Sequence, residues 1–171
     1  RRQRGRLTDP RDIPRGIVAQ KRKVMVRARG KGVAAIVKSA ESPGWGPQAP
    51  VQFQEGVAYT IDHLLDFGVV PYTTGRMYER GEGMTGVGDM LTVQRWIPES
   101  RELVYYSERP GVTVHEILNF NQDRVWKIAV LDFIIANKDR HEGNIMVETK
   151  TKRIWAIDHH KTFEESWTEW H

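Results

Sequence analysis

The strongest constraint on the fold of this chain lies in residues 121–158, where a helical pattern passes directly into a strand pattern. In NQDRVWKIAVLDFIIANKD, apolar residues recur at steps of three and four, which predicts a largely buried helix that ends near Asn137. The apolar runs NIMVE and RIWAID follow, joined by the polar TKTK, which predicts a hairpin with a tight turn at 149–152. The helix positions expected to face the core are Val125, Ile128, Ala129, Ile135 and Ala136.

The upstream half of the chain is strand-rich and contains one helix. KVMVRARGKGVAAIVKSA alternates apolar and polar residues around a glycine turn at 30–32, which predicts a hairpin. After a loop rich in proline and glycine at 41–50, VQFQEGVAYTIDHLLDFG has helical spacing and Gly68 at its C-terminal end. VVPYTTGRMYER and DMLTVQRWIPES predict two further strands, separated by a turn-rich segment.

Length and composition limit the class of protein. A chain of 171 residues can bury a core as one domain without disulfides or a structural metal. Cysteine is absent, which excludes disulfides and thiolate metal sites and favours a reducing, cytoplasmic compartment. No apolar stretch is long enough to cross a bilayer, so we expect that this chain is not an integral membrane protein. Because the first residue is Arg, we expect a processed product or a piece of a longer chain.

The positive charge is concentrated at the N-terminus. Residues 1–38 carry 13 Lys and Arg against 2 Asp, while the remaining residues carry 13 against 20 Asp and Glu, so the net charges are +11 and −7. A basic arm at 1–23 could contact an anionic partner by charge, and a solvated extension is an equally good interpretation. Its arginines are not interleaved with aromatic residues, so the arm lacks the stacking groups of a single-strand nucleic-acid binder.

Polar groups are concentrated after the predicted helix and after the predicted hairpin. Asp139 and Asn144 share the loop that follows the helix, and Asp158 ends the returning strand, so the hairpin should bring all three to one edge. Carboxylate and amide oxygens suit Mg²⁺, which leaves positions open for water and substrate phosphate. The first Asp could orient or deprotonate an attacking hydroxyl. Asp132, within the helix, is expected to anchor this loop by hydrogen bonds.

NKDRHEGN followed by AIDHHKTF resembles the catalytic loop and metal-binding segment of the phosphatidylinositol 3- and 4-kinase-like group of atypical kinases, including its small bacterial members. The resemblance implies a two-lobed, protein-kinase-like α+β fold and phosphoryl transfer from ATP with Mg²⁺. It makes Asp139 the catalytic base and Asn144 and Asp158 the metal ligands. Arg140 and His141 complete the loop, with His141 as a loop organiser or phosphate contact.

The same resemblance extends to the upstream half. It implies that Lys38 pairs with the ATP phosphates and that Glu55, on the following helix, holds this lysine. The residues implied to line the adenine are Gln94, Arg95, Trp96 and Ile97. The sequence departs from the family pattern in two places. The turn at 30–32 lacks the fuller glycine-rich signature of a phosphate-covering loop. Only 13 residues follow Asp158, which implies a minimal C-lobe.

The resulting hypothesis divides the chain into a basic arm at 1–23, an N-lobe at 24–100 and a minimal C-lobe at 101–171, with Mg-ATP bound between the lobes. The expected partners are a nucleotide and a phosphoryl acceptor. The sequence does not show whether the acceptor is a lipid, a protein or a small molecule. One alternative is a degenerate kinase fold that serves as a component of a larger assembly, such as a viral or phage particle. Another is a metal-dependent hydrolase that uses Asp139 and Asp158 together with His141, His159 and His160.

Overall fold

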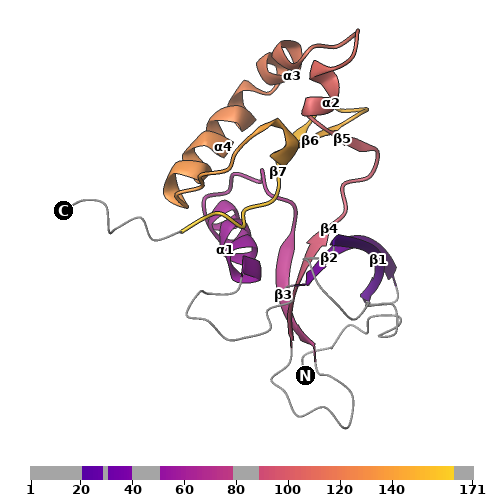
Figure 1. The fold of residues 1–171 in the computed structure, drawn as a ribbon, viewed down its shortest axis with the longest axis vertical. Coiled ribbons are helices and arrows are strands. Elements are labelled where there is room, and N and C mark those ends of the chain that lie inside the picture. The colour runs from indigo at the N-terminus through magenta and orange to yellow at the C-terminus, as the bar shows by residue number, and fades with distance from the viewer. Residues whose placement is uncertain (1–20, 29–30, 40–50, 79–88, 164–171) are drawn as a thin grey trace, which may run out of the picture. The chain divides into compact units, whose positions relative to one another are not determined.

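The computed structural model describes residues 21–28, 31–39, 51–78 and 89–163, and these form a mixed α+β protein with antiparallel sheets. This confirms the predicted fold class. The chain divides into two compact units, residues 1–56 with 72–96 and residues 57–71 with 97–171, and each is treated on its own (Figure 1). No helix in the described ranges is both long and apolar enough to cross a membrane.

The first unit contains a four-stranded antiparallel sheet in the order β1-β2-β4-β3. Its strands are β1 Lys21–Ala28, β2 Lys31–Ser39, β3 Thr73–Tyr78 and β4 Asp89–Arg95. The predicted hairpin is confirmed by the pairing of β1 with β2, in which Val26 lies opposite Val33. Of the turn predicted at 30–32, residue 30 lies outside the described residues, and Lys31 and Gly32 belong to β2. Along β2, Ala35 and Val37 are buried between half-buried neighbours, the alternation of a strand that covers a core on one face.

Helix α1, Val51–Leu64, is confirmed where the sequence predicted it and belongs to both units along the chain. Its end is fixed by Asp62, whose carboxylate accepts the backbone N–H groups of Val69 and Val70 at 2.9 and 3.2 Å. Gly68 adopts a φ of 60° in the turn that makes this return possible. Leu64 is 77% exposed, so the apolar run at the end of the helix contributes little to the core.

The second unit contains a three-stranded antiparallel sheet, β5-β6-β7, together with the C-terminal helices (Figure 1). Its elements are β5 Ser100–Glu102, α2 Val104–Ser107, α3 Val114–Phe120, α4 Gln122–Ile134, the short 3-10 helix η2 Glu142–Asn144, β6 Ile145–Glu148 and β7 Ile154–Ala156. The hairpin predicted from NIMVE and RIWAID is therefore confirmed. Its core combines residues of helices, strands and loops: Leu103, Ile117, Ile128, Leu131, Ile135, Val147 and Ile154.

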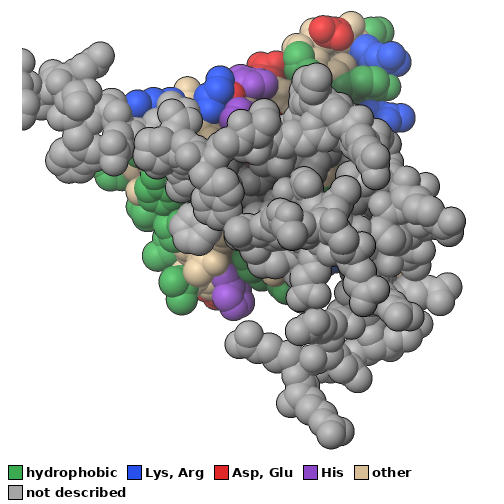
Figure 2. All heavy atoms as spheres, turned by 60° about the horizontal axis from the view of Figure 1, so that its bottom comes forward, with side chains coloured by type: hydrophobic (Ala, Val, Ile, Leu, Met, Phe, Trp, Pro, Cys, Tyr) green, Lys and Arg blue, Asp and Glu red, His purple; other side chains and the backbone are tan. Residues whose placement is uncertain are grey.

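Helix α4 differs from the prediction in length and burial. It ends at Ile134, three residues before Asn137, and only one of its faces is buried. Trp126 and Phe133 are 72% and 87% exposed, and Figure 2 shows hydrophobic side chains on the described surface. The prediction of a largely buried helix was wrong. Ala129 and Ala136, which were expected to face the core, are exposed. The reason is that apolar residues occupy more than one face of α4, while a single stripe meets the core.

Helix α3 was not predicted from the sequence, although the sequence carries a signal for it. Thr113 accepts the backbone N–H of Glu116, and the Glu116 carboxylate accepts the N–H of Thr113 at 2.7 Å, which together form a capping box. These hydrogen bonds lower the pKa of Glu116. The segment TVHE therefore starts the helix, and it directly follows a glycine-proline-rich turn that masked the pattern.

Candidate active site

The loop after α4 is anchored by a carboxylate from within the helix. Asp132 accepts the side-chain amide of Asn137 at 2.7 Å, and the Asn137 side-chain oxygen accepts the backbone N–H of Asp139 at 3.1 Å. Between them, Ala136 has a φ of 48°, so the chain reverses sharply at the end of the helix. The predicted anchoring role of Asp132 is confirmed, and Asp139 starts from a backbone fixed in place.

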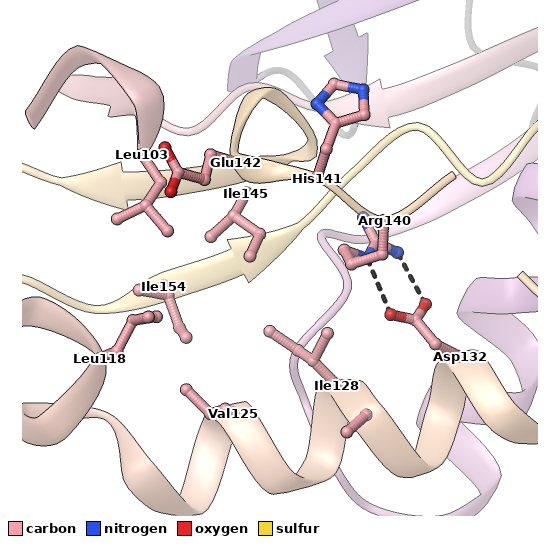
Figure 3. Close-up of a pocket in the computed structure, with 11 residues that line it drawn as sticks. Leu103, Leu118, Val125, Ile128, Asp132, Arg140, His141, Glu142, Ile145 and Ile154 are labelled. Atoms are coloured by element: carbon pink, nitrogen blue, oxygen red, sulfur yellow. Dashed lines mark hydrogen bonds and ion pairs between the residues drawn. The ribbon is translucent and has the colours of Figure 1, made fainter. Parts of the chain in front are cut away.

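Arg140 joins three elements of the second unit. Its Nε and Nη2 donate to the two carboxylate oxygens of Asp132, each at 2.9 Å, as Figure 3 shows. Its Nη1 donates to the backbone oxygens of Asn144 and Ile157, both at 2.8 Å. Both charged side chains are mostly buried, at 14% and 13% exposed, and a two-pronged guanidinium–carboxylate pair fixes orientation as well as distance. Arg140, predicted as part of the catalytic set, is a positioning residue in this geometry.

The same network brings Asn144 and the start of the Asp158 segment together. Asn144 is buried, its side-chain nitrogen donates to the backbone oxygen of Asp139 at 2.8 Å, and its own backbone oxygen accepts the N–H of Ile157 at 3.0 Å. Asp139, Asn144 and the residue preceding Asp158 are thus connected by hydrogen bonds. The convergence that the sequence predicted for this edge is found in the backbone.

The carboxylate predicted as the catalytic base and the carboxylate predicted as a metal ligand each have a partner from the segment after β7. The Lys161 ammonium lies 3.1 Å from the Asp139 carboxylate, and the His160 Nδ1 lies 2.9 Å from the Asp158 carboxylate. Asp158 also has a φ of 60°, a left-handed conformation that is uncommon for a residue with a side chain. Local backbone strain of this kind concentrates at functional sites, and the fixed neighbours at Ile157 and Asn144 maintain it.

The groups that could hold Mg²⁺ are oxygens. Because the Asn144 nitrogen is used toward Asp139, the side-chain oxygen of Asn144 is the end that remains for a cation, and it accepts no hydrogen bond from the described residues. Together with the Asp158 carboxylate it supplies hard oxygen ligands, and Mg²⁺ characteristically completes its shell with water and substrate phosphate. The residues present therefore fit this ion.

The three histidines named in the hydrolase alternative have different surroundings. Within the described ranges, no group of three or more His, Cys, Asp or Glu side chains is placed to hold one metal ion. The ring of His141 accepts the backbone N–H of Gly143 at 3.1 Å and caps η2, which is a loop-organising role. A Cβ at Gly143 would lie 2.9 Å from that ring, so a larger residue there would displace the ring. His159 is fully buried, while His160 is half-buried and lies in the turn that follows β7.

In the first unit, Lys38 on β2 forms an ion pair with Glu55 on α1. The exposed fractions of the two side chains are 13% and 2%, so the pair lies in a largely dehydrated position. The contact between the two residues, which the sequence predicted, is confirmed. Their roles toward ATP phosphates stay a prediction.

The residues predicted to line the adenine occupy the end of β4 and the chain beyond it. Gln94 is buried and donates to the Thr73 hydroxyl across the sheet at 3.0 Å, Arg95 is exposed and Trp96 is half-buried. Ile97 is buried and belongs to the second unit, so the chain passes from one unit to the other directly after Trp96. A nucleotide contact by these residues stays a prediction.

Comparison with known protein families gives a match to the C-terminal part of the chain. The family model described as phosphatidylinositol 3- and 4-kinase matches residues 98–171, which include the loop with Asp139 and Asn144 and the segment with Asp158. Residues 98–171 are therefore similar to this family, in agreement with the resemblance found in the sequence. The match does not extend over Lys38 and Glu55. A search of curated protein sequences gave no match.

Two contributors to this kinase-like site had no signal of their own in the sequence. The contacts of Arg140 with the backbone oxygens of Asn144 and Ile157 depend on carbonyl groups, which every residue carries. Lys161 reaches Asp139 because its backbone oxygen accepts the N–H of Lys138 at 3.2 Å, which ties the end of the described chain to the loop. Neither contact follows from residue type or spacing.

Proposed function

We propose that this chain is an ATP- and Mg²⁺-dependent phosphotransferase of the phosphatidylinositol 3- and 4-kinase-like group that acts on an alcohol group. The observation that supports this most is the hydrogen-bond network of the second unit. In it, Arg140 holds the backbones of Asn144 and Ile157 while Asn144 holds that of Asp139. The segments that carry Asp139, Asn144 and Asp158 are thereby connected, which supports a site where two carboxylates and an amide serve phosphoryl transfer.

In this proposal each residue has one task. Asp139 accepts a hydrogen bond from the acceptor hydroxyl and holds its proton as the hydroxyl oxygen attacks. Asn144 and Asp158 would hold Mg²⁺, which when bound neutralises negative charge on the phosphates. Lys38 contacts the ATP phosphates, and Glu55 orients its ammonium group. His141 and Arg140 keep the loop in place.

The substitution Asp139→Asn tests the proposal. Loss of the proton-accepting group should lower ADP formation by about 10²–10⁴-fold, while the dissociation constant for ATP stays within about twofold. ADP release and calorimetric titration of the full chain measure the two quantities. Asp123→Asn is the matched control, since Asp123 is an exposed acid on α4 paired with Lys127 and should leave both unchanged. Loss of ATP binding together with turnover would contradict the assignment of Asp139.

The pairing of both carboxylates supports a second candidate, a kinase-like domain that no longer transfers phosphate and serves in a larger assembly. Lys161 and His160 occupy the carboxylates that would otherwise face an acceptor and a metal. Under this candidate the wild-type chain folds but its melting temperature does not respond to Mg-ATP, and Lys161→Ala does not restore ADP formation. A response of the wild type to Mg-ATP would remove this candidate.

A further inference from the structure

Two arginines of the second unit converge on one backbone oxygen, away from the residues proposed for phosphoryl transfer. Arg124, on α4, and Arg153, at the start of the returning strand, each donate from Nη2 to the oxygen of Gly68, at 2.8 and 3.3 Å. Both guanidinium groups also lie over the ring of Trp155, with their central carbons 5.0 and 4.4 Å from its centroid. The two positive charges are therefore close neighbours.

Most of the hydrogen-bonding capacity of this arginine pair is unused. Each guanidinium has five N–H groups. Arg124 uses one toward Gly68 and one from Nε toward the oxygen of Ile154 at 2.8 Å, and Arg153 uses one. Neither arginine forms an ion pair with another described residue. Several donors of each side chain therefore remain for a ligand.

The acidic groups near the arginine pair are engaged elsewhere. Glu148 accepts hydrogen bonds from Thr151 and from the Trp155 ring N–H. Burial raises its pKa, but these hydrogen bonds and the two arginines outweigh burial, so the pKa of Glu148 is lowered overall and the carboxylate stays charged. The carboxylate of Asp62 accepts backbone N–H groups after α1, and Asp123 pairs with Lys127. These charges reduce the repulsion between the arginines without contacting them.

The position is costly for a cation. Burial, and after it the charge of Arg153, lower the pKa of Arg124 to about 10, against the attraction of the nearby carboxylates. Two like charges that share one carbonyl oxygen in a partly dehydrated place are stabilised when an anion lies between them.

We propose that Arg124 and Arg153 form a binding site for a phosphate group, carried either by a small free ligand or by the headgroup of a phosphorylated lipid. A tetrahedral phosphate offers several acceptor oxygens and can accept from two guanidinium forks at once. The alternative is that the arginines only satisfy the backbone oxygens of Gly68 and Ile154, which requires three of their ten donors. The site shares no residue with the loop of Asp139 and Asn144.

Titration of the full chain with inorganic phosphate in the absence of magnesium, together with flotation on phosphatidic acid and phosphatidylcholine vesicles, tests this site. Binding of inorganic phosphate indicates that the phosphate group is sufficient. Binding of phosphatidic acid vesicles alone indicates a lipid source, since phosphatidylcholine carries no free phosphomonoester. Arg153→Gln should weaken the observed binding about tenfold or more, because it removes charge-assisted hydrogen bonds.

Lys150→Gln is the matched control, because Lys150 is an exposed lysine of the same hairpin turn that pairs with Glu99 and lies outside the site. It should change binding by less than about twofold. Trp155 emission should also change on binding, and Trp155→Phe identifies that part of the signal. Equal losses in the two charge variants would overturn the proposal, since they would show binding by overall charge. Absence of binding to both probes by the folded wild type would overturn it as well.

Discussion

The two units each contain a buried cation–carboxylate pair, and the pairs are built differently. In the first unit, a strand lysine, Lys38, faces a helix glutamate, Glu55, through a compact ammonium group. In the second, the planar guanidinium of Arg140 grips both oxygens of Asp132 and also holds two backbone oxygens. The flexible lysine side chain can turn its ammonium group from the carboxylate toward a ligand. The Arg140 guanidinium makes four hydrogen bonds and would lose them if it moved. We infer that the first pair serves binding and the second serves architecture.

The largest expected effect is the loss of the architectural pair. Arg140→Met leaves the Asp132 carboxylate buried without its guanidinium and frees two backbone oxygens, so the free energy of unfolding should fall by about 3–5 kcal/mol. Urea denaturation of the purified chain measures this. Arg140→Lys should recover only part of the loss, because an ammonium group cannot reproduce the two-pronged geometry. A change below about 1 kcal/mol for Arg140→Met would show that the pair is not structural.

Double substitution separates the two pairs more sharply. Replacement of Lys38 by Met together with Glu55 by Leu removes both charges from a dehydrated position, and most of the stability lost in Lys38→Met alone should return. Replacement of Arg140 by Met together with Asp132 by Leu should not recover stability. The reason is that Asn137, Asn144 and Ile157 also lose their partners. Equal recovery in the two double variants, measured by urea denaturation, would remove the distinction.

The smallest expected effect concerns the capping box of α3. The hydrogen bonds from Thr113 lower the pKa of Glu116 from its ordinary value of 4.5. The stabilisation by the charged carboxylate is therefore complete above pH 4.5 and is lost as the pH falls through the lower folded value. Glu116→Gln should melt slightly below the wild type at pH 7, and the difference should shrink toward pH 4. A difference independent of pH would refute the charged capping box.

The sequence predicted those parts of the fold that rest on periodicity. The two hairpins, α1 and the position of α4 follow from spacing, and the anchoring by Asp132 follows from one acid in an apolar helix. Burial of α4 was overestimated because Trp126 and Phe133 are apolar yet face outward. Spacing alone cannot show which of two apolar faces meets the core, because neighbouring elements decide it.

The residues of the candidate site could be proposed from the sequence, but the contacts and backbone conformations that hold them could not. Asp139, Asn144 and Asp158 were found by residue type and order, and their segments converge. The left-handed backbone of Asp158 was not predicted, because aspartate adopts this conformation in some contexts and not in others, and residue type does not decide which. The pairing of Lys161 with Asp139 likewise arises from the tertiary path of the chain.

The most direct measurement is a calorimetric titration of the full chain with ATP, with and without magnesium, for the wild type and for Asp158→Asn. If Asn144 and Asp158 hold the ion, the wild type binds ATP more tightly with magnesium, and the substitution removes that dependence while the chain stays folded. ATP binding with the same magnesium dependence in both proteins, or no ATP binding by the folded wild type, would contradict the proposed phosphotransfer site.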